Sequence, residues 1–204
     1  MAGAFISFEG GEGSGKSTQA RLLADWLKSR GQEVVLTREP GGTPGAEAVR
    51  ALLVTGEAAR WNAWSEACLV NAARADHIAR VIAPALARGA TVVCDRFVDS
   101  TRAYQGAGKG LADAELLVLH RLACGDLWPD LTIVLRVDPG IGLARAATRG
   151  DSERRFESHG DGFHARVTAF FNALPDAEPA RCRGFDAAQP IDALAAQIAA
   201  AVAP

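Results

Sequence analysis

The sequence has little that would place it at a membrane or on a nucleic acid. Its net charge is -2 over 204 residues, so any anion binding has to come from local arginines. No apolar run approaches the length that spans a bilayer, and no basic segment followed by an apolar run marks a secretion signal. We therefore expect a cytoplasmic protein with no membrane partner and no nucleic-acid partner.

Cysteine is scarce and widely spaced. The four cysteines, Cys68, Cys94, Cys124 and Cys182, form no C-x-x-C pair, which argues against a metal site and against a disulfide framework. We expect reduced and mostly buried thiols. With 49% hydrophobic residues, the chain is long enough for one sizeable core and too short for two, so residues 1–204 are expected to form a single domain.

A glycine-rich stretch near the N-terminus is the strongest functional signal. Residues 10–17 match the phosphate-binding pattern G-x-x-x-x-G-K-[ST], between a short apolar strand and an amphipathic helical run at 19–30. Glycines let backbone N–H groups converge on a phosphate, and the N-terminus of the following helix favours an anion. A glycine-rich β-turn is the simpler alternative, which the flanking strand and helix disfavour.

The chemistry of this loop assigns roles to two side chains. Lys16 would bridge the β- and γ-phosphates of a nucleotide, and the Ser17 hydroxyl would bind the Mg²⁺ that shields them. The nucleotide-binding residues predicted here are Gly10, Gly11, Glu12, Gly13, Ser14, Gly15, Lys16, Ser17 and Thr18.

A second strand and a shaped loop follow the first helix. Residues 33–37 form a short β-branched run, and residues 38–45 contain too much proline and glycine to be regular. Strand, helix and strand in this order make a right-handed βαβ unit, in which ligands lie at the carboxyl ends of the strands. The loop that begins at Arg38 is therefore expected to face the phosphate-binding loop.

The middle of the chain predicts a long helical region and a third strand. The helical pattern runs over 47–88, with a break near Gly56 and a kink at Pro84. The strand at 91–94 is apolar throughout and ends in Asp95 and Arg96. Asp95 would either cap the strand end or order Mg²⁺, and the phosphate-binding loop favours the metal role.

Two polar segments lie in the second half. Residues 99–110 read most simply as a surface loop, but their tyrosine, amide and hydroxyl groups follow a strand end and suit recognition of a small polar ligand. Residues 145–160 hold four arginines, which form either a solvated face or a lid that closes over phosphates; we favour the lid. The remaining elements predicted are helices over 113–124, 161–174 and 191–202, another helix that Asp138 caps, and strands over 131–137 and 181–185.

Several motifs occur in the order that one family shows. They are F-E-G-G-E-G-S-G-K-S at 8–17, T-R-E-P-G-G-T at 37–43, A-A-R at 72–74, D-R at 95–96, S-T-R-A-Y-Q-G at 100–106, R-F-E at 155–157 and D-A-A-Q-P at 186–190. They resemble the bacterial thymidylate kinases, within the P-loop nucleoside monophosphate kinases. The resemblance implies an α/β P-loop NTPase fold, with a five-stranded parallel sheet flanked by helices and a mobile lid segment.

The resemblance also implies a reaction and an assembly. ATP and dTMP would give ADP and dTDP, in dTTP synthesis, with Mg²⁺ as cofactor and a homodimer as the assembly. A phosphate monoester is already a competent nucleophile, so catalysis reduces to positioning and charge neutralisation. The implied catalytic residues are Lys16, Arg38, Arg96, Arg149 and Arg155, the implied metal ligands are Ser17 and Asp95, and the further implied ATP contacts are Arg145 and Gln189.

Residues for dTMP follow from the same resemblance. They are Glu12, Arg38, Pro40, Val70, Arg74, Arg96, Thr101, Tyr104 and Gln105. The two arginines 38 and 96 would hold the acceptor phosphate, with bidentate forks that lysine does not offer. Glu12 would orient the deoxyribose 3′-hydroxyl, and Tyr104 would pack where a 2′-hydroxyl would lie. Arg74 and Gln105 would address the base edge.

Three features set this chain apart within the family pattern. Val70 stands where the family usually has a phenylalanine that stacks on thymine, and lost stacking weakens binding by about 1 kcal/mol or somewhat more. The lid segment looks one residue longer, with Arg154 in place of a common aspartate. Gly13 stands where some members carry a basic residue, which resembles the subgroup whose catalytic arginine comes from the lid: Arg149 first, then Arg155.

Two other functions stay open at this point. A kinase for another pyrimidine monophosphate, such as dUMP, would keep the phosphate-binding loop and Arg38 but change its base contacts. A P-loop ATPase or GTPase switch would need a water-positioning residue and, for GTP, an N-K-x-D motif that the sequence lacks. Nucleotide hydrolysis without an acceptor would indicate a switch, and acceptor-dependent ADP release would indicate a kinase.

Overall fold

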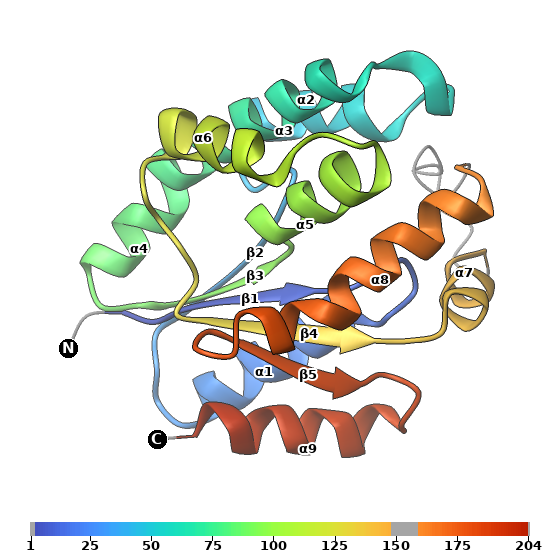
Figure 1. Cartoon of the computed structure of the whole chain (residues 1–204). Coiled ribbons are helices and arrows are strands. Elements are labelled where there is room, and N and C mark those ends of the chain that lie inside the picture. Colours follow the sequence, from blue (N-terminus) through green and yellow to red (C-terminus); the bar gives the residue numbers. More distant parts are fainter. Residues whose placement is uncertain (1–2, 148–158, 204) are drawn as a thin grey trace.

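The computed structural model describes residues 3–147 and 159–203, in which a parallel sheet lies between layers of helices (Figure 1). The strands are β1 Phe5–Glu9, β2 Val34–Arg38, β3 Thr91–Asp95, β4 Leu131–Arg136 and β5 Cys182–Asp186. Their order across the sheet is β2-β3-β1-β4-β5, and every neighbouring pair is parallel. The predicted five-stranded parallel sheet is confirmed.

Helices connect these strands. They are α1 Lys16–Ser29, α2 Pro44–Val54, α3 Ala63–His77, α4 Ala83–Ala87, α5 Val98–Thr101, α6 Asp113–Cys124, α7 Pro139–Ala147, α8 Asp161–Ala177 and α9 Ile191–Val202. Between them lie a short 3-10 helix, η1 Ala58–Arg60, and two π-helical segments, η2 Ile78–Ile82 and η3 Arg102–Gly108. In the part of the chain that the structure describes, no helix combines the length and the apolar character needed to cross a membrane.

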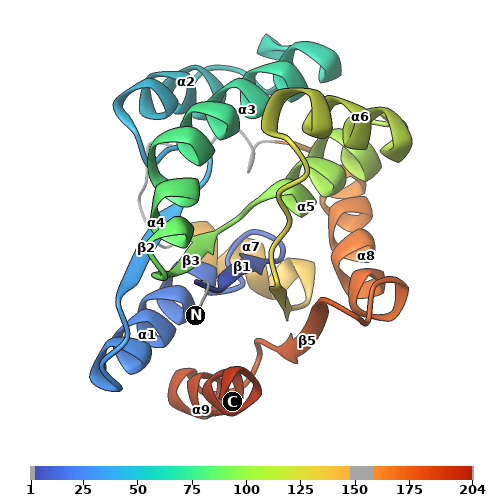
Figure 2. The same cartoon turned by 90° about the vertical axis from the view of Figure 1, so that its left-hand side faces the viewer.

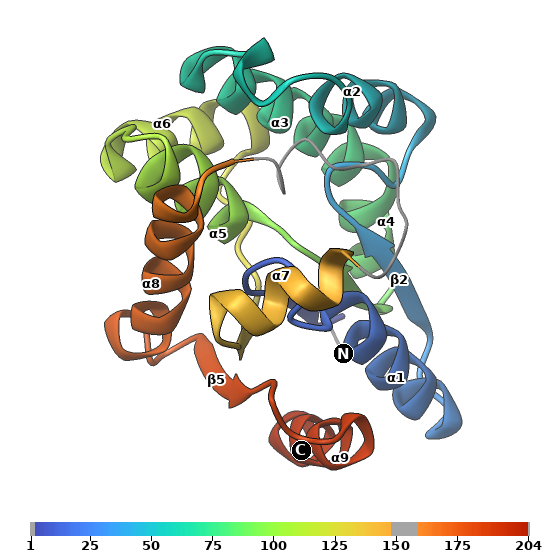
Figure 3. The ribbon, with the colours of Figure 1, turned by 90° about the vertical axis from the view of Figure 1, so that its right-hand side faces the viewer.

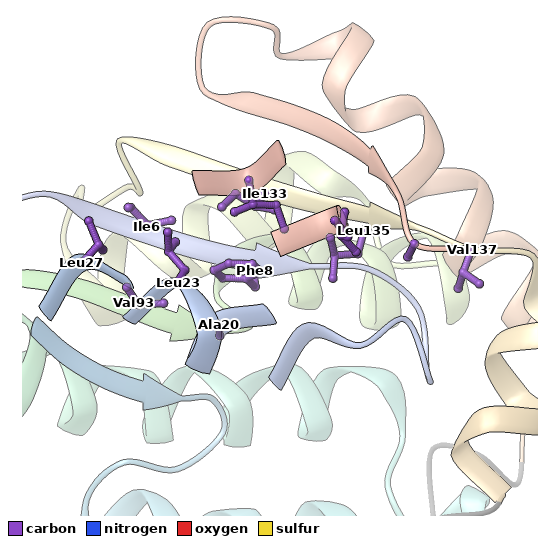
Figure 4. Packing of buried hydrophobic residues seen from close by; sticks show 12 residues of the cluster. Ile6, Phe8, Ala20, Leu23, Leu27, Val93, Ile133, Leu135 and Val137 are labelled. Atoms are coloured by element: carbon purple, nitrogen blue, oxygen red, sulfur yellow. The ribbon is translucent and has the colours of Figure 1, made fainter. Parts of the chain in front are cut away.

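Side chains alternate along β1, so each face of the sheet has its own core. Ile6 and Phe8 face α1 and α9 and pack with Leu23 of α1 (Figure 4). Phe5 points to the opposite face, where its ring lies 4.8 Å from that of Phe97. Figure 2 shows the two layers, with α1 and α9 on one side and α4 and α8 on the other. Burial of each such apolar side chain contributes roughly 1.5–3 kcal/mol. All five positions of β1 are buried, so its polar side chains have to be hydrogen-bonded.

Helices extend into two segments for which the sequence offered an irregular loop, 38–45 and 99–110. α2 begins at Pro44 and not at residue 47, because the Thr43 side chain caps it by accepting from Ala46 N at 3.0 Å. Residues 99–110 form α5 and η3 for most of their length, so the surface-loop interpretation is wrong. Both segments border the carboxyl ends of the strands, which Figure 3 views end-on.

The long predicted helical region is interrupted near Gly56, as the sequence indicated. It breaks after Val54, close to Gly56, and resumes at Ala63, where the Asn62 side chain accepts from Ser65 N at 2.8 Å. Near Pro84 the chain stays helical, and the π-helical segment η2 comes directly before α4. Proline has no N–H to donate, and the wider π-helical turn accommodates the hydrogen bond that is missing there.

Candidate active site

The phosphate-binding loop joins the end of β1 to the start of α1, as the sequence predicts. Gly10 and Gly13 adopt positive φ angles of 142° and 65°, and Gly15 adopts 87° as the residue before α1. Gly13 also has to be glycine for space, because a Cβ there would lie 1.8 Å from the carbonyl oxygen of Gly142 in α7. The start of α7 therefore packs directly against the loop.

Lys16 is folded back over the loop that carries it. Its Nζ donates to the carbonyl oxygens of Gly10 at 3.0 Å and Gly11 at 2.7 Å, and to Ser14 Oγ at 3.2 Å. Burial, followed by the positive charge of Arg96, lowers the pKa of Lys16 to about 8. All three acceptors are neutral oxygens, so the charged ammonium would gain interaction energy if it turned to an anionic phosphate.

Ser17 and Asp95 meet across the gap between α1 and β3. The Ser17 hydroxyl donates to Asp95 Oδ2 at 2.5 Å. The other carboxylate oxygen, Asp95 Oδ1, is buried and has no hydrogen-bond partner among the described residues. The register of the sheet explains the meeting, since Asp95 lies opposite Phe8 at the end of β1, where the loop starts.

Arg96 gathers two other predicted residues around it. Its Nη2 donates to Glu12 Oε1 at 3.0 Å, and the hydroxyl of Tyr104 donates to the same oxygen at 2.7 Å. The Arg96 guanidinium lies 5.0 Å from the centre of the Tyr104 ring. Arg96 is also the one residue other than glycine with a positive φ, 71°, among the described residues. Such a conformation costs of order 1 kcal/mol or more and is typical of functional sites.

Arg38 and Arg50 flank the mouth of the site. Arg38 ends β2, and its side chain is 54% exposed and pairs with Glu47 at 3.1 Å. Arg50 on α2 donates to the carbonyl oxygen of Pro40 at 2.9 Å. The early start of α2 therefore sets one carboxylate and one further arginine beside the loop that begins at Arg38.

A buried polar chain connects this loop to the predicted base pocket. Thr37 Oγ1 lies 2.7 Å from His77 Nε2, and His77 Nδ1 lies 3.0 Å from Glu39 Oε1. Glu39 Oε2 accepts from Arg74 Nε at 2.7 Å, and Arg74 Nη2 donates to Thr101 Oγ1 at 3.0 Å. Arg74 is 1% exposed, so a paired network of this kind has to hold its charge in place.

All of the residues predicted to bind dTMP line one cavity of about 270 Å³. They are Glu12, Arg38, Pro40, Val70, Arg74, Arg96, Thr101, Tyr104 and Gln105. The same cavity reaches Gly13, Gly15, Lys16, Ser17 and Asp95 of the predicted nucleotide and metal sets. It is also lined by residues to which the sequence analysis gave no role, namely Glu39, Arg50, Val54, Phe97 and Ser100.

The residues predicted on the outer, ATP side are only partly described. Arg145 on α7 donates to the carbonyl oxygen of Ala187 at 2.9 Å, and Gln189 Oε1 accepts from Gln197 at 2.7 Å. α7 therefore contacts the segment that carries Gln189. Arg149 and Arg155, with most of the predicted lid, lie outside the described residues, so their roles stay predictions.

Comparison with known proteins identifies the family. A family model described as thymidylate kinase matches residues 8–198. The chain is 54% identical over 196 residues to the thymidylate kinase of Caulobacter vibrioides, across 96% of this chain and 94% of the relative. It is 52% identical over 191 residues to that of Pseudomonas fluorescens, across 94% and 90%. The chain belongs to the thymidylate kinase family.

A solved structure agrees with this assignment. The crystal structure of thymidylate kinase from Ehrlichia chaffeensis aligns with a TM-score of 0.79 at 33% identity, over 100% of both chains. Membership of the family makes the chain a phosphotransferase with a P-loop NTPase fold, as its motifs predicted.

Glu9, at the end of β1, supports this site from behind the cavity, and the sequence analysis gave it no role. Its carboxylate is 0% exposed and accepts from Phe97 N at 2.7 Å, Ser100 N at 3.2 Å and Ser100 Oγ at 2.6 Å. Burial, followed by the charge of Asp99, raises the pKa of Glu9 to about 7. Glu9 thus caps the helical segment that carries Tyr104. The sequence did carry a signal, because a carboxylate at the end of a buried strand needs hydrogen-bond partners.

Because of the raised pKa of Glu9, the fold should become less stable as the pH rises from 5 to 8. Its pKa is about 7 in the folded protein against 4.5 ordinarily, so the fold binds its proton more tightly. That contribution is full below pH 4.5 and is lost as the pH rises through 7. We expect about 2–3 kcal/mol less free energy of unfolding at pH 8 than at pH 5 from this group, and little of that change in Glu9→Gln. Urea unfolding of both proteins measures it, and equal pH slopes would contradict it.

Proposed function

We propose that the protein transfers the γ-phosphoryl group of ATP to dTMP, giving ADP and dTDP for dTTP synthesis. The observation that carries this proposal is the cavity, which joins the phosphate-binding loop to a buried polar pocket. A nucleoside monophosphate placed in it would have its phosphate at Arg38 and Arg96, beside Lys16. Its base would lie against Arg74 and Gln105.

The proposed chemistry needs positioned charge and no strong base. An oxygen of the acceptor phosphate attacks the γ-phosphorus in line with the leaving ADP oxygen. Lys16 would turn from the loop carbonyls to the β- and γ-phosphates, where its charge offsets the charge that spreads during transfer. Arg38 and Arg96 would hold the attacking phosphate, so that the repulsion between two anions is reduced as they approach.

The sugar and the base would be recognised by residues that already contact one another. Glu12, held by Arg96 and Tyr104, would orient the 3′-hydroxyl, and the Tyr104 ring would occupy the space of a 2′-hydroxyl. Val70 is 8% exposed and packs with Leu53, so it offers the base an aliphatic wall in place of an aromatic one.

Ser17 and Asp95 fit the Mg²⁺ that the family implies. A hard cation takes oxygen ligands, commonly one or two carboxylates together with substrate phosphates. Asp95 offers a buried oxygen with no partner in the described structure, next to the Ser17 hydroxyl. When bound with ATP, the ion would neutralise phosphate charge during transfer.

Replacing Asp95 with asparagine should raise the Mg²⁺ concentration that gives half-maximal rate by at least about tenfold, a loss that even indirect metal contacts show. Titration of Mg²⁺ at saturating ATP measures it. Asp25→Asn, an exposed change on α1, is the matched control and should leave the titration unchanged. An Asp95→Asn titration that follows the wild type would remove Asp95 from the metal site.

The lid, the assembly and the location are further proposals. Residues 145–160 would close over ATP, with Arg149, or else Arg155, as the arginine that meets the transferred group and Arg145 toward the adenine beside Gln189. The four cysteines are free thiols, which suits the reducing cytoplasm.

A homodimer is supported by an apolar face on α3 and α6. Trp64, Val118 and Leu122 are 42%, 46% and 82% exposed there. A second copy related by a two-fold axis would cover this face with the same face of its own.

Product analysis tests the proposed reaction. With Mg-ATP alone, ADP release should be negligible, and dTMP should start it with dTDP as the second product. ADP release that is independent of any acceptor would favour an ATPase, and turnover with dUMP equal to that with dTMP would favour the broader pyrimidine kinase.

A further inference from the structure

A buried carboxylate lies behind the proposed base pocket. Glu66 on α3 is 0% exposed, and its Oε1 accepts from Gln105 Nε2 at 2.7 Å. Its Oε2 pairs with Lys109 Nζ at 2.9 Å. Gln105 belongs to η3 and lines the cavity, whereas Glu66 and Lys109 stand behind it. The cluster therefore links α3 to the segment that faces the base.

We propose that Glu66 fixes the amide of Gln105 in one orientation and thereby selects the base of the acceptor. This inference rests on the proposed function, since it concerns the same pocket. A carboxylate paired with an ammonium accepts at both oxygens and donates nothing. The end of the Gln105 amide that faces Glu66 has to be its NH₂ group, so Oε1 is the end left for a ligand. The opposite orientation would set two acceptors against each other in a buried place.

This orientation has a consequence for hydrogen bonding. Gln105 Oε1 can only accept, so it matches a pyrimidine with an N–H at position 3, as in thymine and uracil, and opposes the N3 lone pair of cytosine. Arg74 only donates, and among the described residues the hydrogen bond of its Nη1 is a long one, 3.5 Å to Asn71 Oδ1. Arg74 therefore matches a carbonyl at position 4 of the base and opposes an amino group there. Glu66 is thus a positioning residue, which acts through Gln105 without touching the substrate.

Glu66→Gln tests the proposal, because a glutamine at 66 both donates and accepts and lets the Gln105 amide turn. The ratio of kcat/KM for dTMP to that for dCMP should fall about tenfold or more, mainly through a lower KM for dCMP, with kcat for dTMP within about threefold of wild type. An unchanged ratio in the folded variant would overturn the proposal. Wild-type protein that fails to phosphorylate dTMP would instead overturn the proposed function, so the two failures are distinct.

Two further variants complete the test. Glu33→Gln removes a carboxylate from an exposed ion pair with Arg88, away from the cavity, and should leave the ratio unchanged. The exchange Glu66→Gln with Gln105→Glu moves the carboxylate to position 105, where it still only accepts from N3–H. This double variant should keep the dTMP preference even where the single variant does not fold. A double variant that accepts dCMP as readily as dTMP would contradict the proposal.

Discussion

Replacing Lys16 with methionine should lower kcat at least about a thousandfold while the protein stays folded. A positioned cation or donor at a transferring group is worth roughly 10²–10⁵ in rate. The charge of Lys16 already destabilises the fold, since burial disfavours the charged form and lowers the pKa of Lys16 to about 8. Removal of that charge therefore offsets the loss of its hydrogen bonds to the loop, and the unfolding temperature should change little.

The control for this variant is Lys28→Met, in the exposed last turn of the same helix. It removes an equal charge from α1 and should leave kcat within about twofold of wild type. A Lys16→Met protein that is folded and retains a tenth of the wild-type kcat would contradict the role given to the phosphate-binding loop.

Replacing Asp99 with asparagine should lower the free energy of unfolding by about 3 kcal/mol, the largest stability effect we expect from an isosteric change. Asp99 is 0% exposed and accepts from Arg102 at 2.9 Å and from Arg181 at 2.7 and 2.8 Å. Breaking such a buried pair leaves charge uncompensated, at a cost of roughly 3–5 kcal/mol. Glu178 contacts both arginines and offsets part of that cost.

Asp113→Asn is the matched control, because Asp113 also pairs with Arg102, at 2.8 and 2.9 Å, but is 47% exposed. Its loss should cost about 1 kcal/mol or less. Chemical denaturation of both variants gives the comparison, and equal losses of unfolding free energy would show that burial does not make the ion pairs of Asp99 more stabilising than that of Asp113.

Helices could be predicted from the sequence where periodicity and end signals agree. α6 and α9 occupy the predicted 113–124 and 191–202, since Gly125 follows the first and Pro190 precedes the second. Residues 99–110 show the opposite case. Gly106 and Gly108 argue against a helix by propensity, yet Gly108 is needed there because a Cβ would lie 2.4 Å from the Phe163 ring. Packing against α8 outweighs local preference.

In the candidate site, too, local motifs could be recognised from the sequence, whereas contacts between distant residues could not. The residues that the motifs single out for dTMP line one cavity, because the topology brings the carboxyl ends of β1, β2 and β3 together, while their roles stay predictions. The residues that orient them were missed. Glu66 meets Gln105 and His77 meets Glu39 across 39 and 38 positions of sequence, and no local spacing reveals such pairs.

The most direct test of the proposed function is acceptor-dependent ADP formation from Mg-ATP, with dTMP, dUMP, dCMP and GMP in parallel. The site predicts clear preference for dTMP, with dUMP next because it shares the N3–H and the 4-carbonyl, and with dCMP and GMP far behind. Such a ranking would also show that Arg74, Tyr104 and Gln105 suffice with Val70 as the wall of the base pocket. Absence of ADP formation with every acceptor would contradict the assignment of this cavity to nucleoside monophosphate phosphorylation.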